Sequence, residues 1–189
     1  MRVAVVILAA VLVGCGLAGC DRAATPSASS VKLGGPFALI DAEGRPVTDR
    51  SLLGKPTAIF FGFTYCPEVC PTTLAELTAA LKALGPQGDA LNVVFVSVDP
   101  ARDTPAQMKA YLANFDPRIQ GFTGSAAAVD AAVKAYRIYR KTVPIEGGGY
   151  TVDHSSAVYL FDKTGRFVEP IAYGAPHRRV VDRLRRLVS

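Results

Sequence analysis

Two apolar runs in the middle of the chain predict buried strands. Residues 57–63 and 92–98 carry no charge and are rich in β-branched and aromatic side chains. Runs of this length and composition are typical of strands that are covered on both faces, as in the parallel sheets of α/β proteins. We therefore expect a central sheet with helices packed against it.

Apolar side chains recur at helical spacing between and after these runs. The spacing predicts helices over residues 72–84, 104–115, 125–136 and 176–188. Gly85 and Pro86 end the first of them. Thr104 and Ser125 suit the N-cap position of the second and third, because their hydroxyls accept a hydrogen bond from a free backbone N–H.

Shorter segments at both ends of the domain predict hairpins. Residues 37–40 lead into a turn-rich stretch, and residues 156–161 and 166–171 flank a turn over residues 162–165. Strand, helix, strand, helix, then a hairpin and a helix is the order of the thioredoxin fold. The sequence thus predicts the α/β class: a thioredoxin-like fold with an N-terminal β extension and a C-terminal β-hairpin plus helix.

The amino terminus has the pattern of an export signal. Arg2 precedes an uncharged run over residues 3–13, and small residues then lead to Cys20. A run this short is typical of a secretory signal and is too short for a membrane-spanning helix. The Leu-Ala-Gly-Cys sequence that ends at Cys20 resembles the bacterial lipobox, whose cysteine is lipidated. We therefore expect a lipoprotein-type signal peptide over residues 1–19 and lipidation of Cys20, with an ordinary signal peptide or an uncleaved anchor as the alternative.

Cys15 also follows a lipobox-like sequence and is the alternative processing site. Residues 20–34 are mostly small or polar, a composition that suits a flexible tether, and residues 35–189 remain as the folded domain. Asp21 directly after Cys20 resembles the retention signal of inner-membrane lipoproteins. The expected location is the bacterial inner membrane, on its periplasmic side, through a lipid anchor.

Composition and charge argue for one globular domain and against nucleic-acid binding. The chain has 189 residues, of which 50% are hydrophobic, too many for a disordered protein. The formal net charge of +5 is concentrated at the carboxyl end, where residues 177–189 hold five arginines and the single acidic Asp182. One basic terminal helix is not the basic surface of a nucleic-acid-binding domain, and we expect no nucleic-acid partner.

Cys66 and Cys70 are the cysteines that remain when Cys15 and Cys20 belong to the leader. They lie where the first buried strand passes to the first long helix, and Pro71 suits the first helical turn. The free N–H groups at a helix start lower the pKa of a thiol and favour the thiolate. Thiolates four residues apart serve a redox pair or a soft metal equally well. A purely structural disulfide is less favoured, because so short a loop constrains little chain entropy.

Four blocks of sequence occur in a recognisable order. They are Gly35-Pro36-Phe37, residues 62–71 around the cysteines, residues 96–105 and residues 150–155. Together they resemble the Sco/SenC family of thioredoxin-like copper proteins, which help to assemble cytochrome c oxidase. The resemblance spans residues 34–189. Glu68 stands where the family usually has Asp, which preserves the charge.

The resemblance implies a copper site at Cys66, Cys70 and His154. Family members bind one copper ion through two cysteines and a distant histidine, and His154 stands at the matching position. Two sulfurs and a neutral imidazole suit Cu(I), whereas structural zinc almost always takes four protein ligands. Binding of Cu(II) is left open. Asp153 is a candidate to accept a hydrogen bond from a ligand, with a solvated loop residue as the alternative.

The function implied by the resemblance is that of an exported copper metallochaperone. It delivers copper to the binuclear copper centre of cytochrome c oxidase, and its partners are the apo copper-centre subunit, a copper donor protein and a thiol reductant. Two alternatives use the same sulfurs: a thiol–disulfide reductase that keeps the oxidase cysteines reduced, and a copper or redox sensor. We expect no classical enzyme, although oxidoreductase activity through a reversible Cys66–Cys70 disulfide stays open.

The stretch that carries His154 distinguishes these alternatives further. No proline lies between Pro144 and Pro170, where thioredoxin-like redox enzymes usually place the proline that faces their cysteines. The missing proline and the added histidine favour metal binding. Glycines at 147–149 predict a segment that moves at low cost, so we expect His154 to close onto the cysteines when copper binds. His177, the second histidine, is expected to be exposed.

Overall fold

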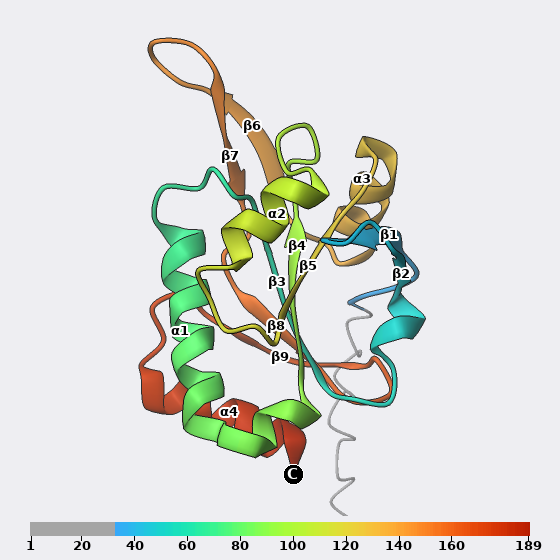
Figure 1. Cartoon of the computed structure of the whole chain (residues 1–189), viewed down its shortest axis with the longest axis vertical. Coiled ribbons are helices and arrows are strands. Elements are labelled where there is room, and N and C mark those ends of the chain that lie inside the picture. The colour runs from blue at the N-terminus through green and yellow to red at the C-terminus, as the bar shows by residue number, and fades with distance from the viewer. Residues whose placement is uncertain (1–32) are drawn as a thin grey trace, which may run out of the picture. The chain divides into compact units, whose positions relative to one another are not determined.

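The structure is a computed structural model that describes residues 33–189 (Figure 1). The expected signal peptide, Cys15, Cys20 and residues 20–32 of the expected tether lie outside the described residues. Gly34 already contacts the folded domain, because its N–H donates to the carbonyl of Ala135 at 3.1 Å. In the described part of the chain, no helix combines the length and the apolar character that a membrane crossing requires.

A seven-stranded sheet with the strand order β2-β1-β5-β4-β3-β8-β9 forms the centre of the domain. Its strands are β1 (Ala38–Asp41), β2 (Pro46–Thr48), β3 (Thr57–Gly62), β4 (Asn92–Ser97), β5 (Ile119–Thr123), β8 (Val158–Phe161) and β9 (Phe167–Ile171). β3, β4 and β5 are parallel, whereas β8 is antiparallel to β3 and β1 is antiparallel to β5. The thioredoxin-like α/β fold with β extensions at both ends is confirmed.

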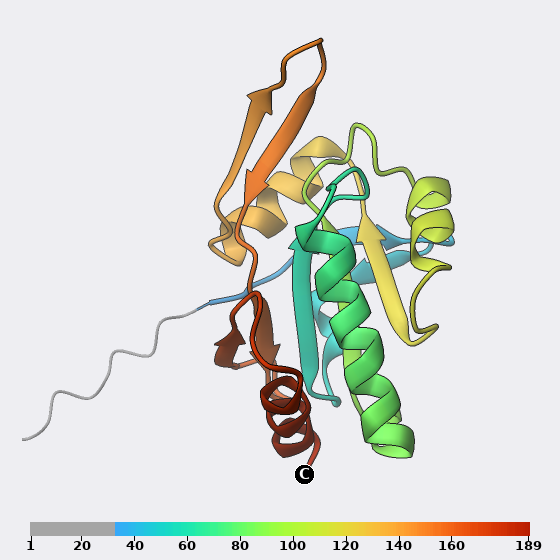
Figure 2. The ribbon, with the colours of Figure 1, turned by 90° about the vertical axis from the view of Figure 1, so that its left-hand side faces the viewer.

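Helices cover both faces of this sheet. They are α1 (Val69–Leu84), α2 (Pro105–Leu112), α3 (Ala126–Ala135) and α4 (His177–Val188), with short 3-10 helices η1 (Asp49–Leu52) and η2 (Gly85–Ala90). α1 and α2 lie in front of the sheet in Figure 1, and Figure 2 shows α3 on the opposite face. Thr104 and Ser125 cap α2 and α3 as predicted, each accepting a hydrogen bond from a backbone N–H three residues further on.

The two strands predicted to be buried form the middle of the core. All six residues of β3 and five of the six in β4 are buried. Phe60, Phe61 and Phe95 are at most 1% exposed, and full burial of each such ring contributes about 1.5–3 kcal/mol to folding. Both strands end at the same edge of the sheet, so the residues that follow them start from a rigid base.

A separate hairpin was not predicted. β6 (Arg140–Pro144) and β7 (Tyr150–His154) pair with each other and extend beyond the carboxyl ends of the parallel strands (Figures 1 and 2). Residues 147–149 form its turn, with φ angles of +84°, +97° and +85° that glycine adopts readily. His154 is therefore the last residue of a strand and not part of a loop.

Other differences from the expected elements are smaller. β5 was missed because a five-residue strand with Gly121 at its centre has a weak apolar pattern; a Cβ there would lie 2.6 Å from the Leu112 side chain. α2 ends at Leu112 instead of Phe115, and β8 begins at Val158, two residues later than expected. α1 begins at Val69 and not at residue 72, so Cys70 lies inside its first turn.

Candidate metal centre

Cys66 and Cys70 flank the junction between β3 and α1. In the loop that follows β3, the Cys66 N–H donates to the carbonyl of Phe63 at 3.2 Å and closes a tight turn. The turn brings the Cys66 Sγ to 3.4 Å from the backbone N–H of Cys70, which lies in the first turn of α1. Cys70 is buried, Cys66 is partly exposed, and both are free thiols. The start of the helix thus supplies a hydrogen-bond donor to the more accessible sulfur.

His154 reaches this pair from the end of β7. Its Nε2 lies 3.6 Å from the Cys70 Sγ, and its Nδ1 lies 2.8 Å from the backbone oxygen of Ser155. A carbonyl oxygen only accepts hydrogen bonds, so this contact keeps the proton on Nδ1 and turns the lone pair of Nε2 toward the sulfurs. The edge of the ring packs at 86° against Phe63, with 5.7 Å between ring centres, and this contact fixes its orientation.

The three side chains form one cluster. Their ligand atoms, two sulfurs and one ring nitrogen, all lie within 4.8 Å of one another. The structure thus brings together the three predicted ligands, although His154 follows Cys70 by 84 residues in the sequence. Two soft sulfurs and one imidazole within this distance are a donor set that suits Cu(I).

The pKa values of the two thiols in the cluster are shifted in opposite directions. A hydrogen bond from the Cys70 thiol lowers the pKa of Cys66 to about 4, and the backbone N–H groups of Glu68 and Cys70 act in the same direction against the effect of burial. The pKa of Cys70 is raised, first by its hydrogen bond to Cys66 and then by burial. The helix-start argument predicted a lowered pKa without distinguishing the two residues. Of the two cysteines, Cys66 therefore loses its proton first in the metal-free pair.

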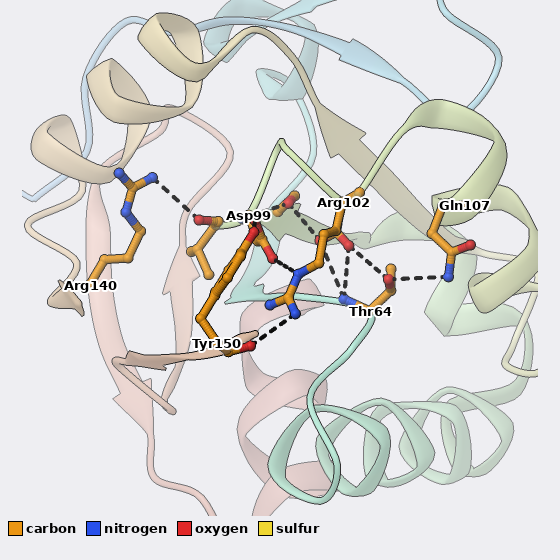
Figure 3. Close-up of polar contacts among 9 residues, drawn as sticks. Thr64, Asp99, Arg102, Gln107, Arg140 and Tyr150 are labelled. Carbon is orange, nitrogen blue, oxygen red and sulfur yellow. Dashed lines mark hydrogen bonds and ion pairs between the residues drawn. The ribbon is translucent and has the colours of Figure 1, made fainter. Parts of the chain in front are cut away.

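A buried carboxylate supports the cysteine loop from below. Asp103 accepts hydrogen bonds from the backbone N–H of Thr64 at 3.2 Å and from its hydroxyl at 2.7 Å, and the Ser97 hydroxyl donates to it at 2.7 Å. Gln107 also donates to the Thr64 hydroxyl at 3.3 Å (Figure 3). Burial raises the pKa of Asp103 in spite of these donors. The carboxylate thus fixes the loop two residues before Cys66.

Asp153 and His177 lie outside the cluster of three ligand residues. Asp153 is exposed and pairs opposite Lys141, and the hydrogen bond on the His154 Nδ1 goes to the Ser155 carbonyl instead. A role of Asp153 beside a ligand stays a prediction without a contact to support it. His177 is exposed as expected, and its Nδ1 lies 2.7 Å from a carboxylate oxygen of Glu76 on α1.

Neither Asp103 nor Thr64 was predicted to support the cysteine loop. Both lie in the sequence blocks that carry the family resemblance. A polar residue at the end of an uncharged strand and an acidic residue beside a helix cap were the available signals. Neither signal indicates that the two side chains meet 39 residues apart.

Comparisons with known proteins agree on one family. A family model described as SCO1/SenC matches residues 25–189. The protein SenC from Rhodobacter capsulatus is 41% identical over 148 residues, which cover 78% of this chain and 66% of that protein. The mitochondrial SCO1 homolog 1 from Arabidopsis thaliana is 41% identical over 153 residues, which cover 80% of this chain and 45% of that protein.

Among solved structures, copper-bound ScoI from Bradyrhizobium japonicum is 48% identical and superposes with a TM-score of 0.77. The match covers 82% of this chain and 99% of that one. The chain spans about half the length of the mitochondrial relatives that it matches, between 45% and 54%.

Proposed function

The chain belongs to the SCO1/SenC family, and we propose that it is a copper metallochaperone that delivers copper to the binuclear copper centre of cytochrome c oxidase during assembly. The observation that carries the proposal is the approach of two thiols and one imidazole to within 4.8 Å. It is supported by the copper bound to ScoI from Bradyrhizobium japonicum, a relative that is 48% identical.

The protonation of the site suits the uptake of Cu(I). Cys66 offers a thiolate before metal arrives, because the Cys70 thiol lowers its pKa to about 4. Cys70 releases its proton when it becomes a ligand, since only the thiolate binds a soft metal. The third ligand is the Nε2 of His154, whose lone pair is directed by the hydrogen bond from Nδ1 to Ser155. Binding therefore releases one proton at neutral pH.

The exposure of the two sulfurs suits the release of copper as well. Cys66 is partly exposed, whereas Cys70 is buried beneath it. An acceptor thiolate reaches the copper from the Cys66 side and replaces the ligands one at a time, so that the ion stays coordinated throughout. Tyr65, which is 55% exposed, flanks this open side and contributes to the surface that an acceptor subunit meets.

A second function is supported by the same asymmetry. In thiol–disulfide exchange, an exposed thiolate attacks one sulfur of an acceptor disulfide and displaces the other as a thiolate. Cys66 has the exposure and the lowered pKa for this attack. Cys70 then loses its proton and attacks the Cys66 sulfur of the mixed disulfide, which frees the second acceptor thiol. Two electrons pass to the acceptor and a Cys66–Cys70 disulfide remains.

His154→Ala separates the two functions. We expect Cu(I) affinity, measured by competition with a chromophoric chelator, to fall at least about tenfold through loss of one ligand. The rate of disulfide reduction should stay close to that of the unmodified protein, since exchange uses the sulfurs alone. His177→Ala, which removes the other histidine, is the matched control and should change neither quantity. Unchanged Cu(I) affinity in His154→Ala would contradict the proposed ligand set.

We also propose that Cys20 anchors the domain to the periplasmic face of the bacterial inner membrane. The lipobox-like sequence before Cys20 and the small, polar residues 20–34 support this location. Cys20→Ser should move the protein from the membrane fraction to the soluble fraction, whereas Cys15→Ser should not. Mass spectrometry of the mature protein should find a lipidated Cys20 as its first residue. A different first residue without lipid would contradict the proposal.

A further inference from the structure

Arg102 lies between the two halves of the metal centre. The centre of its guanidinium stands 3.9 Å from the ring of Tyr150 and 4.9 Å from the ring of Tyr65. Tyr150 belongs to β7, the strand that ends in His154, and Tyr65 directly precedes Cys66. One planar cation therefore contacts both the histidine strand and the cysteine loop. Figure 3 shows its contact with Tyr150.

Hydrogen bonds at the backbone oxygen and at the hydroxyl of Tyr150 reinforce this stacking. The Arg102 Nε pairs with the carboxylate of Asp99, and its Nη1 donates to the backbone oxygen of Tyr150 at 3.0 Å. The Tyr150 hydroxyl donates to the same carboxylate at 2.9 Å. Asp99, Arg102 and Tyr150 thus form a closed triangle, the Arg102 clasp. Side-chain exposure of 24% for Arg102 and 5% for Asp99 protects the ion pair from solvent screening.

The hairpin depends on such contacts, because two strands alone are only marginally stable in water. A cleft of about 400 Å³ separates part of β6 and β7 from the body, and its lining includes Asp99, Tyr150 and Val152. At the base of the hairpin, Arg140 donates to the backbone oxygen of Val98 at 3.3 Å. The Arg102 clasp likewise joins the hairpin to the body of the domain, at the end of β7 that lies near the hairpin turn.

The clasp also acts on the same face of β7 that carries the histidine. Side chains alternate along a strand, so Tyr150, Val152 and His154 share one face. Val152 between them is buried. A shift of Tyr150 away from Asp99 therefore carries His154 along the same strand and away from the sulfurs.

We propose that Arg102 is a positioning residue of the metal centre, which holds β7 against the cysteine loop and keeps the imidazole of His154 in reach of both sulfurs. This inference rests on the proposed copper site. The role requires a planar fork that donates two hydrogen bonds while it stacks on a ring. Lysine has the charge without this geometry.

The test is a double-mutant cycle of Arg102→Lys and His154→Ala, read as Cu(I) affinity. Arg102→Lys alone should weaken binding about tenfold, as loss of a residue that orients a ligand typically does. In the His154→Ala background the same substitution should cause no further loss, because Arg102 acts through His154. Equal loss in both backgrounds, or no loss in the first, would overturn the inference. His154→Ala alone without effect would instead refute the copper site itself.

Arg118→Lys is the matched control, since Arg118 is 28% exposed and pairs with Asp116, which is 6% exposed, outside the centre. It should lower the melting temperature without changing Cu(I) affinity. In the metal-free protein, Arg102→Lys should accelerate amide exchange in β6 and β7 relative to β3; unchanged exchange would overturn the inference without any use of copper. Tyr150→Phe, which removes only the hydroxyl bond to Asp99, should shift both measurements in the same direction and serves if Arg102→Lys does not fold.

Discussion

Cys70 lies directly against Gly62, so that a Cβ atom at residue 62 would stand 2.7 Å from the Cys70 Sγ. The same atom would lie 2.6 Å from the ring of Phe95, which is fully buried. Neither neighbour is the free end of a flexible surface side chain. The last residue of β3 therefore has no side chain because the sulfur of the following helix occupies that space.

Gly62→Ala should consequently disturb the metal centre through packing alone. We expect a loss of about 1–3 kcal/mol in the free energy of unfolding, as for other overpacked cores, together with weaker Cu(I) binding because Cys70 is displaced. Urea unfolding and chelator competition measure the two effects. Gly35→Ala is the control, since a Cβ there would meet its nearest atom at an ordinary 3.4 Å. Unchanged copper binding in Gly62→Ala would show that the Cys70 sulfur tolerates displacement.

Much of the fold follows from local pattern in this sequence. The uncharged runs at 57–63 and 92–98 are long enough to specify buried strands, and Thr104 and Ser125 specify two helix starts. β6 and β7 escaped prediction because their exposed side chains show no clear alternation and their turn has three glycines. That hairpin is held by contacts with distant elements, which a local pattern does not contain.

The ligand residues of the candidate site could be predicted from the sequence, whereas the residues that hold them in place could not. Cys66 and Cys70 follow a strand and begin a helix, and His154 was found by resemblance. The link from Asp103 to Thr64 spans 39 residues and the link from Arg102 to Tyr150 spans 48. Spacing in the sequence gives no sign of either, because each link joins segments that meet only in the folded chain.

The reactivity of Cys66 should depend on pH in an unusual range. Its pKa is lowered to about 4, first by the hydrogen bond from the Cys70 thiol. Alkylation of the metal-free protein by iodoacetamide should therefore modify Cys66 first, with a midpoint near pH 4 instead of the ordinary value of 9.0. Cys70→Ala removes the donor and should move the midpoint upward. Equal alkylation of both cysteines across the range would contradict the asymmetry.

The lowered pKa of Cys66 also determines the direction in which the stability of the protein changes with pH. An unfolded thiol keeps its ordinary pKa, so between pH 9 and pH 4 the folded state binds fewer protons at Cys66 than the unfolded state does. The contribution of Cys66 is complete above the unfolded value and is lost as the pH falls through the folded one. The metal-free protein should become less stable as the pH falls through this window. Cys66→Ala should flatten the dependence in urea unfolding series.

Asp103→Ala should destabilise the domain by about 3 kcal/mol, because it leaves buried donors at Thr64 and Ser97 without an acceptor. The cysteine loop should loosen with it, which amide exchange at Thr64 would report as faster exchange. Asp89→Ala is the control: this carboxylate is 70% exposed and pairs with Arg118 at the surface. Its substitution should cost about 0.5 kcal/mol or less. Similar costs for the two variants would contradict the supporting role of Asp103.

The tip of the hairpin should matter little for copper. Nothing lies within 4 Å of a Cβ added at Gly147, Gly148 or Gly149, so the turn packs against no other element. Gly148→Ala strains a backbone with φ of +97°, yet Cu(I) affinity should change by no more than about twofold, as for other surface substitutions. A large loss of affinity would instead support movement of this turn during metal binding.

The oxidation state of the two cysteines should control copper binding. Cys66 and Cys70 are free thiols whose sulfurs share one cluster with His154, and a pair this close can form a disulfide in an oxidising compartment. A disulfide leaves His154 and two poor sulfur donors, so the oxidised protein should bind Cu(I) far more weakly than the reduced one. Bound copper should in turn protect the pair, because it occupies both sulfurs, and a dedicated reductant must act before loading.

Titration of the soluble domain with Cu(I), without added thiol, tests this redox gate, by which the disulfide blocks copper binding. One sample is fully oxidised and the other is fully reduced. The reduced sample should bind one equivalent, and the oxidised sample should match it only after reduction. Cys66→Ser is the control, because it cannot form the intramolecular disulfide and its weaker binding should not respond to oxidant in the same way. Equal stoichiometry and affinity in the two unmodified samples would refute the gate, and with it most of the argument for sulfur ligation.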